Sequence, residues 1–418
     1  MDDTITNPKP GSLWRNSDFL KLWSGQTISV FGSMIGGTAM SFTALLFLQA
    51  TPFQMALLSS MQLVPGFLAG LFAGAWVDRV RRRPMMIAVD ISRAVIFGTI
   101  PLAALMGILH IEQLYLVALA VGILTIIFEL AYQAYLPSLV GKQHVVEGNS
   151  KLSASAAVAE FGGFNLGGWL VHIFTAPFAI LIDAVSFLAS ALSLHLIRAH
   201  EMIEHSQESP NMLREIREGL RVVYQHSLLR SSAVVLTIIS LSGGIFSALV
   251  VLYMGRELGF DPGILGMIWA VGGVSSFFGA SLTPYLTRRL NPGPAMVAGL
   301  ALYSVSIFFI PLASGATVLS AIFLIIQQLG DGFFVLYEIN MVSFRQEIIS
   351  ERMLGRVNAT LRFVALGATL VGTLLGGLLG ESLGVRTTLF IAAGGSLIGS
   401  AILAISPIGK LKKTTPQE

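Results

Sequence analysis

Twelve apolar stretches, each long enough to cross a membrane, limit what this chain can fold into. A helix of about twenty apolar residues spans the roughly 30 Å hydrocarbon core of a bilayer. The sequence therefore predicts an all-α membrane protein with twelve transmembrane helices. The stretches lie at about 19–47, 53–77, 85–107, 112–136, 152–173, 176–198, 230–254, 262–287, 294–313, 317–341, 357–380 and 385–407.

The composition agrees with a membrane protein and excludes several other classes. Hydrophobic residues make up 54% of the 418-residue chain and charged residues 12%, and the mean hydropathy is +0.75. There is no cysteine, which excludes disulfides, thiolate metal sites and cysteine nucleophiles. The net charge is only +3 and the basic residues are spread over short loops, so we expect no nucleic-acid partner. The polar N-terminus lacks the pattern of a cleaved signal, so insertion is expected to depend on the first helix.

The placement of the basic residues predicts the topology. Of the 26 Lys and Arg residues, only Arg256 and Arg386 fall in the loops on one side of the twelve spans, and Arg93 and Arg362 fall within spans. All others lie in the tails or in the loops on the opposite side. By the positive-inside rule both termini are cytoplasmic, and we expect a multi-pass protein of the cell inner membrane.

The chain is divided into two related halves. We expect a six-helix half at 1–198, a cytoplasmic linker at 199–229 with an amphipathic helix at about 211–225, and a second six-helix half at 230–418. Such duplication is typical of transporters, whose substrate site lies near the midplane between the halves. Residues recur at a constant offset of half the chain length: Arg79 and Arg288, Glu129 and Glu338, Asn149 and Asn358, Gly163 and Gly372, Gly167 and Gly376, Gly168 and Gly377.

The loop after the second span carries the most specific motif. Residues 74–83 are GAWVDRVRRR. This loop resembles the G-x-x-x-D-R-x-G-R-[RK] motif of the major facilitator superfamily and departs from it at Arg81, where the family has glycine. The resemblance implies a major facilitator fold and gives Gly74, Asp78, Arg79 and Arg82 the role of a conformational latch.

Three further segments narrow the resemblance to one branch. Residues 16–26 (NSDFLKLWSGQ), 181–187 (LIDAVSF) and 354–360 (LGRVNAT) are similar to the macrolide-efflux and enterobactin-export branch. The resemblance implies a drug or siderophore exporter driven by protons. It also places Asp78 beside the start of the eleventh span, where Arg356 would complete the latch.

Glycines spaced four residues apart predict close helix packing. Gly66, Gly70 and Gly74 form such a stripe on the second span, which ends at Asp78. Small residues at this spacing let helices approach closely. In the superfamily fold, helices two and eleven pack across the interface between the halves. The alternative is packing within one half. Matching stripes are Gly372, Gly376 and Gly380 on the eleventh span, and Gly163 and Gly167 on the fifth.

Ionisable residues inside the spans are the candidate functional residues, because each is costly in lipid unless it is paired or faces water. A charge network is predicted from Asp90, Arg93, Glu160 and Arg362, in which Asp90 and Arg93 pair at i,i+3. The alternative role for Asp90, Arg93, Glu129 and Glu160 is purely structural. Desolvation favours the protonated form of a carboxyl group. The candidates for proton coupling are Asp183, Glu129, Asp331 and Glu338, whereas His172 and His195 are expected to be solvated at span ends.

Taken together, the sequence predicts a secondary active transporter that exports a small amphipathic organic molecule in exchange for protons by alternating access. No Walker motif or H-E-x-x-H motif occurs, so neither ATP hydrolysis nor another enzyme activity is expected. We expect no cofactor and no metal, and a monomer in the lipid bilayer whose partners are the substrate and protons. The alternatives are a proton-coupled importer of a nutrient and a non-transporting membrane receptor.

Overall fold

The computed structural model describes residues 13–72, 81–199 and 212–412. These residues form a bundle of long helices, with no strand in the described ranges. Ten of the described helices are long and apolar enough to cross a membrane. Two more, α2 (Pro52–Phe72) and α6 (Val145–Phe174), lie in the same bundle. The predicted all-α membrane protein with twelve transmembrane helices in two halves is confirmed.

The helices of each half overlap the predicted spans, and their ends differ from the prediction by up to seven residues. Those of the first half are α1 (Ser17–Phe42) with η2 (Thr43–Phe47), α2, α4 (Arg82–Leu105), α5 (Ile111–Val140), α6 and α7 (Ala176–His195). Those of the second half are α9 (Ser227–Leu252) with η4 (Tyr253–Glu257), α10 (Pro262–Leu290), α11 (Pro292–Ile307) with α12 (Phe309–Leu312), α13 (Val318–Ile348), α14 (Glu351–Leu383) and α15 (Val385–Ile405). The helix α8 (Met212–Gln225) lies between the halves in sequence. The division of the chain at residues 198 and 229 stays a prediction.

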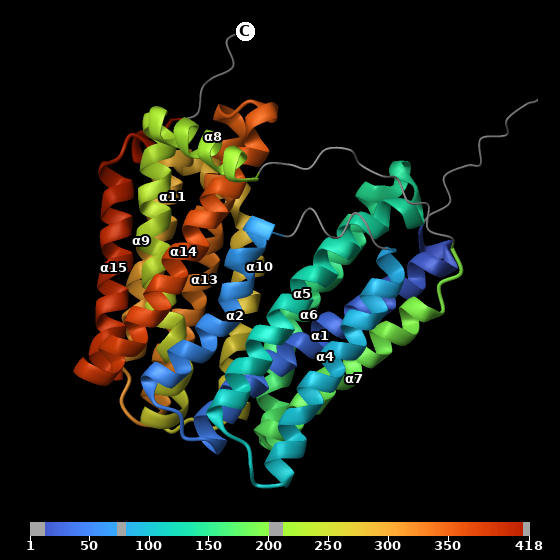
Figure 1. Cartoon of the computed structure of the whole chain (residues 1–418). Coiled ribbons are helices and arrows are strands. Elements are labelled where there is room, and N and C mark those ends of the chain that lie inside the picture. Colours follow the sequence, from blue (N-terminus) through green and yellow to red (C-terminus); the bar gives the residue numbers. More distant parts are fainter. Residues whose placement is uncertain (1–12, 73–80, 200–211, 413–418) are drawn as a thin grey trace, which may run out of the picture.

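The two halves repeat each other in detail. Both first helices end in a five-residue π-helical turn, η2 in one half and η4 in the other. The start of α2 at Pro52 corresponds to the start of α10 at Pro262. In Figure 1 the helices of the two halves form two groups, with α2 lying against α14 of the second half.

The halves are joined at one end of the bundle and separate at the other. We call the end that carries α8 the linker side and the opposite end the far side (Figure 1). Toward the far side, one buried apolar cluster is continuous across both halves and includes Phe42, Leu45, Leu252 and Leu265. Toward the linker side, each half has a core of its own, formed around Phe19 in the first half and Met296 in the second.

Two helix pairs make most of the helix–helix contacts across the halves. α2 packs against α14, as predicted for the second and eleventh helices, and α6 packs against α10. At these contacts the backbones are close: a Cβ on Gly168 would meet the carbonyl oxygen of Pro262, and one on Gly377 would meet Ala56 and Phe53. Small residues are therefore needed at both crossings.

Most of the described glycines of the predicted stripes pack within their own half. Gly372 and Gly376 lie against Leu241 and Ile245 of α9, within their own half. On α6, Gly163 and Gly167 lie against Met34 and Thr38 of α1, also within one half. The expectation that the eleventh-span stripe faces the other half was therefore wrong for Gly372 and Gly376. The glycine next to each stripe, Gly168 or Gly377, faces across instead, because one helical step rotates a residue by about 100°. Gly380 contacts both Pro52 and Leu249.

Candidate functional site

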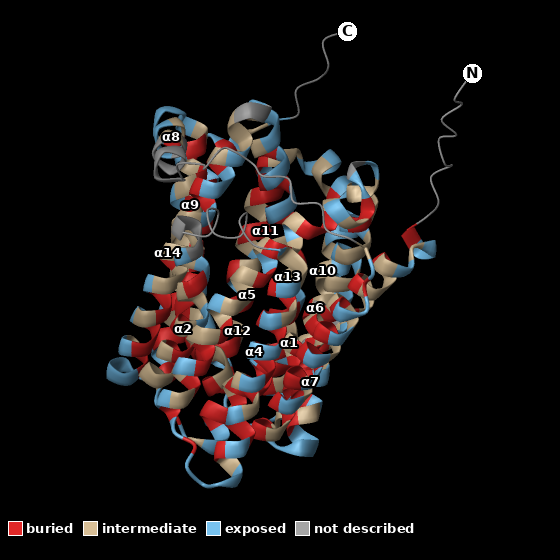
Figure 2. Ribbon diagram, turned by 45° about the vertical axis from the view of Figure 1, so that its right-hand side comes forward, coloured by how far each residue is buried: buried red, intermediate tan, exposed pale blue. Residues whose placement is uncertain are grey.

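Three charged side chains meet inside the first half. Asp90 and Arg93 lie on α4 and Asp183 on α7, and their exposed fractions are 0%, 4% and 1%. Arg93 Nη2 donates to Asp90 Oδ1, so the predicted i,i+3 pair is present. Figure 2 shows how the buried residues are distributed over the helices.

The Arg93 guanidinium is held between two aromatic rings. It lies 4.5 Å from the ring centroid of Phe128 on α5 and 4.3 Å from that of Phe187 on α7. Cation–π contacts of this kind are strongest where water is excluded. Arg93 also interacts electrostatically with Asp183 and Glu129, so three carboxyl groups of this half act on its guanidinium.

Two glycines of α1, Gly32 and Gly36, leave room for the side chains of α7 that include Asp183. A Cβ on Gly36 would collide with the Asp183 carboxyl group, and one on Gly32 would collide with Ser186. The Asp183 Oδ1 accepts hydrogen bonds from Ser186 Oγ (3.1 Å) and Ser33 Oγ (3.3 Å). We define Asp90, Arg93 and Asp183 as the charge cluster.

The charge cluster contains two carboxyl groups and one guanidinium. An uncompensated charge is expensive away from water, whereas a paired set is tolerated. The cluster is electrically neutral when one of its two carboxyl groups holds a proton. This stoichiometry suits a site that takes up and releases a single proton.

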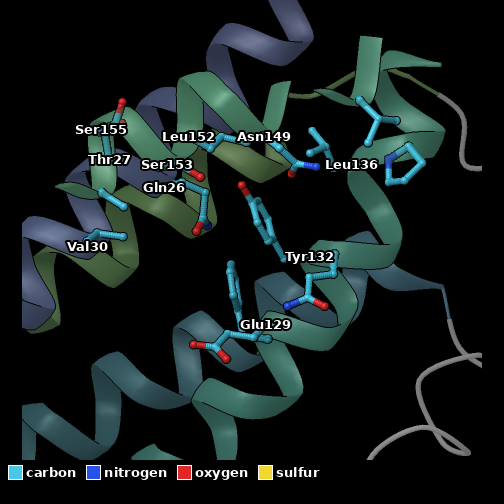
Figure 3. A pocket seen from close by; sticks show the side chains of 15 residues that line it. Gln26, Thr27, Val30, Glu129, Tyr132, Leu136, Asn149, Leu152, Ser153 and Ser155 are labelled. Carbon is cyan, nitrogen blue, oxygen red and sulfur yellow. The ribbon is translucent and has the colours of Figure 1, made fainter. Parts of the chain in front are cut away.

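A pocket of about 570 Å³ adjoins the charge cluster. It is lined by α1, α5 and α6, and Figure 3 shows Gln26, Glu129, Tyr132, Asn149 and Ser153 around it. The volume falls within the range typical of sites for drug-sized ligands, and the lining combines aromatic rings with amides and hydroxyls. Glu129 is the only charged side chain among the described lining residues.

The pocket and the charge cluster share one wall. Phe128 lines the pocket and also contacts the Arg93 guanidinium. Glu129 follows it on α5 and interacts electrostatically with Arg93. A charge placed in the pocket would therefore act electrostatically on Arg93, although the Phe128 ring keeps the two from direct contact.

The proton-coupling candidates of the second half lie apart from this cluster. Asp331 is half-buried on α13 against Gly272 of α10, and its Oδ1 lies 3.4 Å from Gln327 Nε2. Glu338 is exposed on the same helix. Their role in proton coupling stays a prediction, as does that of Glu129 and Asp183.

The predicted latch is only partly described. Gly74, Asp78 and Arg79 lie outside the described residues. Arg82 donates to the carbonyl oxygen of Ala134 (3.3 Å), and Arg356 forms a salt bridge of 2.7 Å with Glu218 of α8. The latch stays a prediction, and of its two described arginines only Arg356 is bound to the linker helix α8.

The other predicted members of the charge network do not join the cluster. Arg362 is exposed on α14. Glu160 lies on α6, and its side chain is outside the described part of the chain. Within the described ranges, no group of three His, Asp or Glu side chains is arranged to hold a metal ion.

Several residues that join the halves on the far side were missed from the sequence. The Arg256 guanidinium of η4 donates to the carbonyl oxygens of Leu45 and Ala50 in the first half, both at 2.8 Å. His172, expected to be solvated, is about half exposed and lies 2.9 Å from Asp261 of the other half. A signal for Arg256 was present, because it is one of only two basic residues predicted in the far-side loops.

Comparisons with known proteins identify the same kind of protein over the whole chain. The sequence pattern of the transmembrane secretion effector family matches residues 10–417. The MFS-type transporter YfiS of Bacillus subtilis (strain 168) is 24% identical over 95% of this chain and 94% of its own length. Macrolide efflux protein A of Streptococcus pyogenes is 23% identical over 50% of this chain and 51% of its own.

Solved structures show the same fold. The nucleoside transporter NupG superposes with a TM-score of 0.76 at 12% identity, covering 94% of this chain and 100% of that one. A bacterial homologue of the iron transporter ferroportin, in an inward-facing state, superposes with a TM-score of 0.73 at 18% identity, covering 92% of this chain and 98% of that one.

Proposed function

Because this chain belongs to the transmembrane secretion effector family of major facilitator transporters, we propose that it exports a small amphipathic organic molecule in exchange for protons. Family membership makes it a multi-pass membrane transporter and not an enzyme, as expected. The proton coupling, the direction, the cell inner membrane with cytoplasmic termini and the monomeric state belong to the proposal.

The observation that carries the proposal is the charge cluster beside the pocket. Two carboxyl groups share one guanidinium, and the Phe128 ring separates them from a cavity of about 570 Å³. One proton neutralises the cluster. The Phe128 ring contacts both the cluster and the pocket, so a change in one site can affect the other. Proton exchange and substrate binding therefore have a common structural element.

The state of the halves supports a cycle of alternating access. The far side is closed by a continuous apolar core and by Arg256, and the linker side has separate cores. With the linker side in the cytoplasm, this state takes up substrate and releases a proton there. Proton loss leaves the cluster with one uncompensated negative charge, which favours rearrangement to a state that can be protonated from the far side.

The test is transport into inside-out vesicles that contain the purified protein, with a macrolide as the first probe. We expect accumulation when the lumen is acidic, and loss of accumulation when a protonophore removes the pH gradient. Accumulation that is indifferent to the protonophore would contradict proton coupling. Accumulation only in right-side-out vesicles would show import instead.

A further inference from the structure

The pocket contains one carboxylate that no other described residue neutralises by direct contact. Glu129 lies on α5 among the pocket-lining residues, and it forms no hydrogen bond or salt bridge with another described residue. A carboxylate within a membrane helix is costly unless it is paired or faces water or a ligand. Glu129 interacts electrostatically with Arg93, and its side chain is exposed in the pocket lining. A ligand in the pocket can therefore contact its carboxylate directly.

The basic groups nearest the pocket are already engaged. Arg93 is paired with Asp90 behind the Phe128 ring. Lys151 of α6 lies 3.3 Å from Glu147 and 4.2 Å from the Trp14 ring centroid. The described lining of the pocket therefore carries one acidic side chain, Glu129, and no basic residue.

The rest of the lining suits the apolar part of a cation. Phe128 and Tyr132 present aromatic rings, which attract cations through their faces. The amides of Gln26, Gln133 and Asn149 are neutral and offer both donors and acceptors. Nothing in this lining would compensate a carboxylate or a phosphate on the ligand.

We infer that Glu129 is the substrate-binding carboxylate of this transporter and that the substrate class is an amphipathic organic cation. The inference rests on the proposed export function and names the substrate class of its pocket. It gives Glu129 a role in binding the ligand and leaves proton uptake to the charge cluster. Since Arg93 interacts with both Glu129 and Asp183, a cation at Glu129 also disfavours a proton on the cluster.

Binding of three probes of similar shape and different charge tests the inference. These are tetraphenylphosphonium (cation), triphenylphosphine oxide (neutral) and tetraphenylborate (anion), measured with the purified full chain in detergent. We expect tetraphenylphosphonium to bind best. Glu129→Gln should weaken its binding on the order of tenfold or more and leave the neutral probe nearly unchanged.

Two further variants separate charge from folding. Glu112→Gln makes the same change in the first turn of α5, outside the pocket lining, and should leave binding unchanged. Gln133→Glu moves a carboxylate one helical turn along the same lining, so the double variant Glu129→Gln/Gln133→Glu should recover part of the cation binding. Unchanged binding of the neutral probe shows that the Glu129→Gln protein is folded.

The inference is overturned if wild type does not bind tetraphenylphosphonium, if it binds the anion or the neutral probe equally well, or if Glu129→Gln binds the cation as wild type does. The proposed function fails separately. If vesicles show no proton-dependent transport of any probe while Glu129→Gln still loses cation binding, the cation site is supported and proton-driven export is contradicted. If the neutral probe is transported in a proton-driven manner and Glu129→Gln has no effect, proton-driven export is supported and the cation site is contradicted.

Discussion

The two halves have the same helices and different chemistry inside them. In the first half, α4 and α7 bury Asp90, Arg93 and Asp183. At the same offset of half the chain length, the matching helices α11 and α15 carry Gly299, Leu302 and Ala392. Of these, Gly299 and Ala392 are buried, and Gly299 lets the backbone of α13 approach closely.

This difference shows that the fold does not need the charge cluster. The second half builds the same six-helix arrangement with apolar residues at the equivalent positions. A buried charged cluster gives weak support to stability, and replacement by apolar residues is often neutral or favourable. We therefore propose that the cluster in the first half is kept for function, whereas Arg256 of the second half bonds to the first half on the far side.

The largest effect is expected from Asp183→Asn. The change keeps the shape of the side chain and removes its ability to carry a proton. Accumulation driven by a pH gradient should be lost, while exchange of labelled for unlabelled probe across the membrane without a gradient continues. The control in the second half is Asp331→Asn, which should retain gradient-driven accumulation. If Asp331→Asn loses coupling and Asp183→Asn keeps it, the proton is carried in the second half, which contradicts the proposal.

A smaller effect, on stability, is expected from Arg93→Leu. This change leaves Asp90 and Asp183 without their guanidinium, and removing one partner of a buried pair typically costs about 3–5 kcal/mol. The triple variant Asp90→Ala/Arg93→Leu/Asp183→Ala makes this site resemble the second half and should be more stable than Arg93→Leu alone. Thermal unfolding in detergent compares the two. A triple variant less stable than the single one would mean that the fold depends on the cluster.

The smallest effect is expected from Arg256→Gln, which weakens the closure of the far side. Hydrogen bonds to a charged group contribute about 1.5–3 kcal/mol. Because the chain has no cysteine, a single Ala56→Cys change at the α2–α14 contact reports on opening. Alkylation from the far side should be faster with Arg256→Gln in this background.

Arg386→Gln is the matched control for the Arg256 change. Arg386 Nε donates to the carbonyl oxygen of Pro311 (2.7 Å), which lies in the same half, so its loss should leave alkylation unchanged. Equal rates in both variants would contradict a role for Arg256 in closure.

The helices were predictable because each is a long apolar segment. The predicted span 385–407 corresponds to Val385–Ile405, and 176–198 to Ala176–His195. α6 was predicted from 152 and begins at Val145, because its first turns are polar. These turns contact the chain before α1, where Glu147 Oε1 accepts from Leu13 N (3.1 Å), so hydropathy alone does not detect them.

The candidate site was only partly predictable. The Asp90–Arg93 pair follows from spacing on one helix, but the approach of Asp183 depends on how α4, α7 and α1 pack. Gly372 and Gly376 were assigned to the wrong partner for a similar reason, since spacing does not determine how a helix is rotated. The pocket is formed by three helices, and its neutral lining residues, such as Gln26 and Tyr132, carried no signal in the sequence.

The most direct test of the central claim, that the proton is held by the charge cluster of the first half, is infrared spectroscopy of the purified protein. The carbonyl stretch of a protonated carboxyl group is separate from that of a carboxylate, so a pH titration follows the proton itself. We predict a carboxyl band that changes with pH in wild type and in Asp331→Asn and is missing in Asp183→Asn. A band that persists in Asp183→Asn and disappears in Asp331→Asn would contradict the claim and move the proton to the second half.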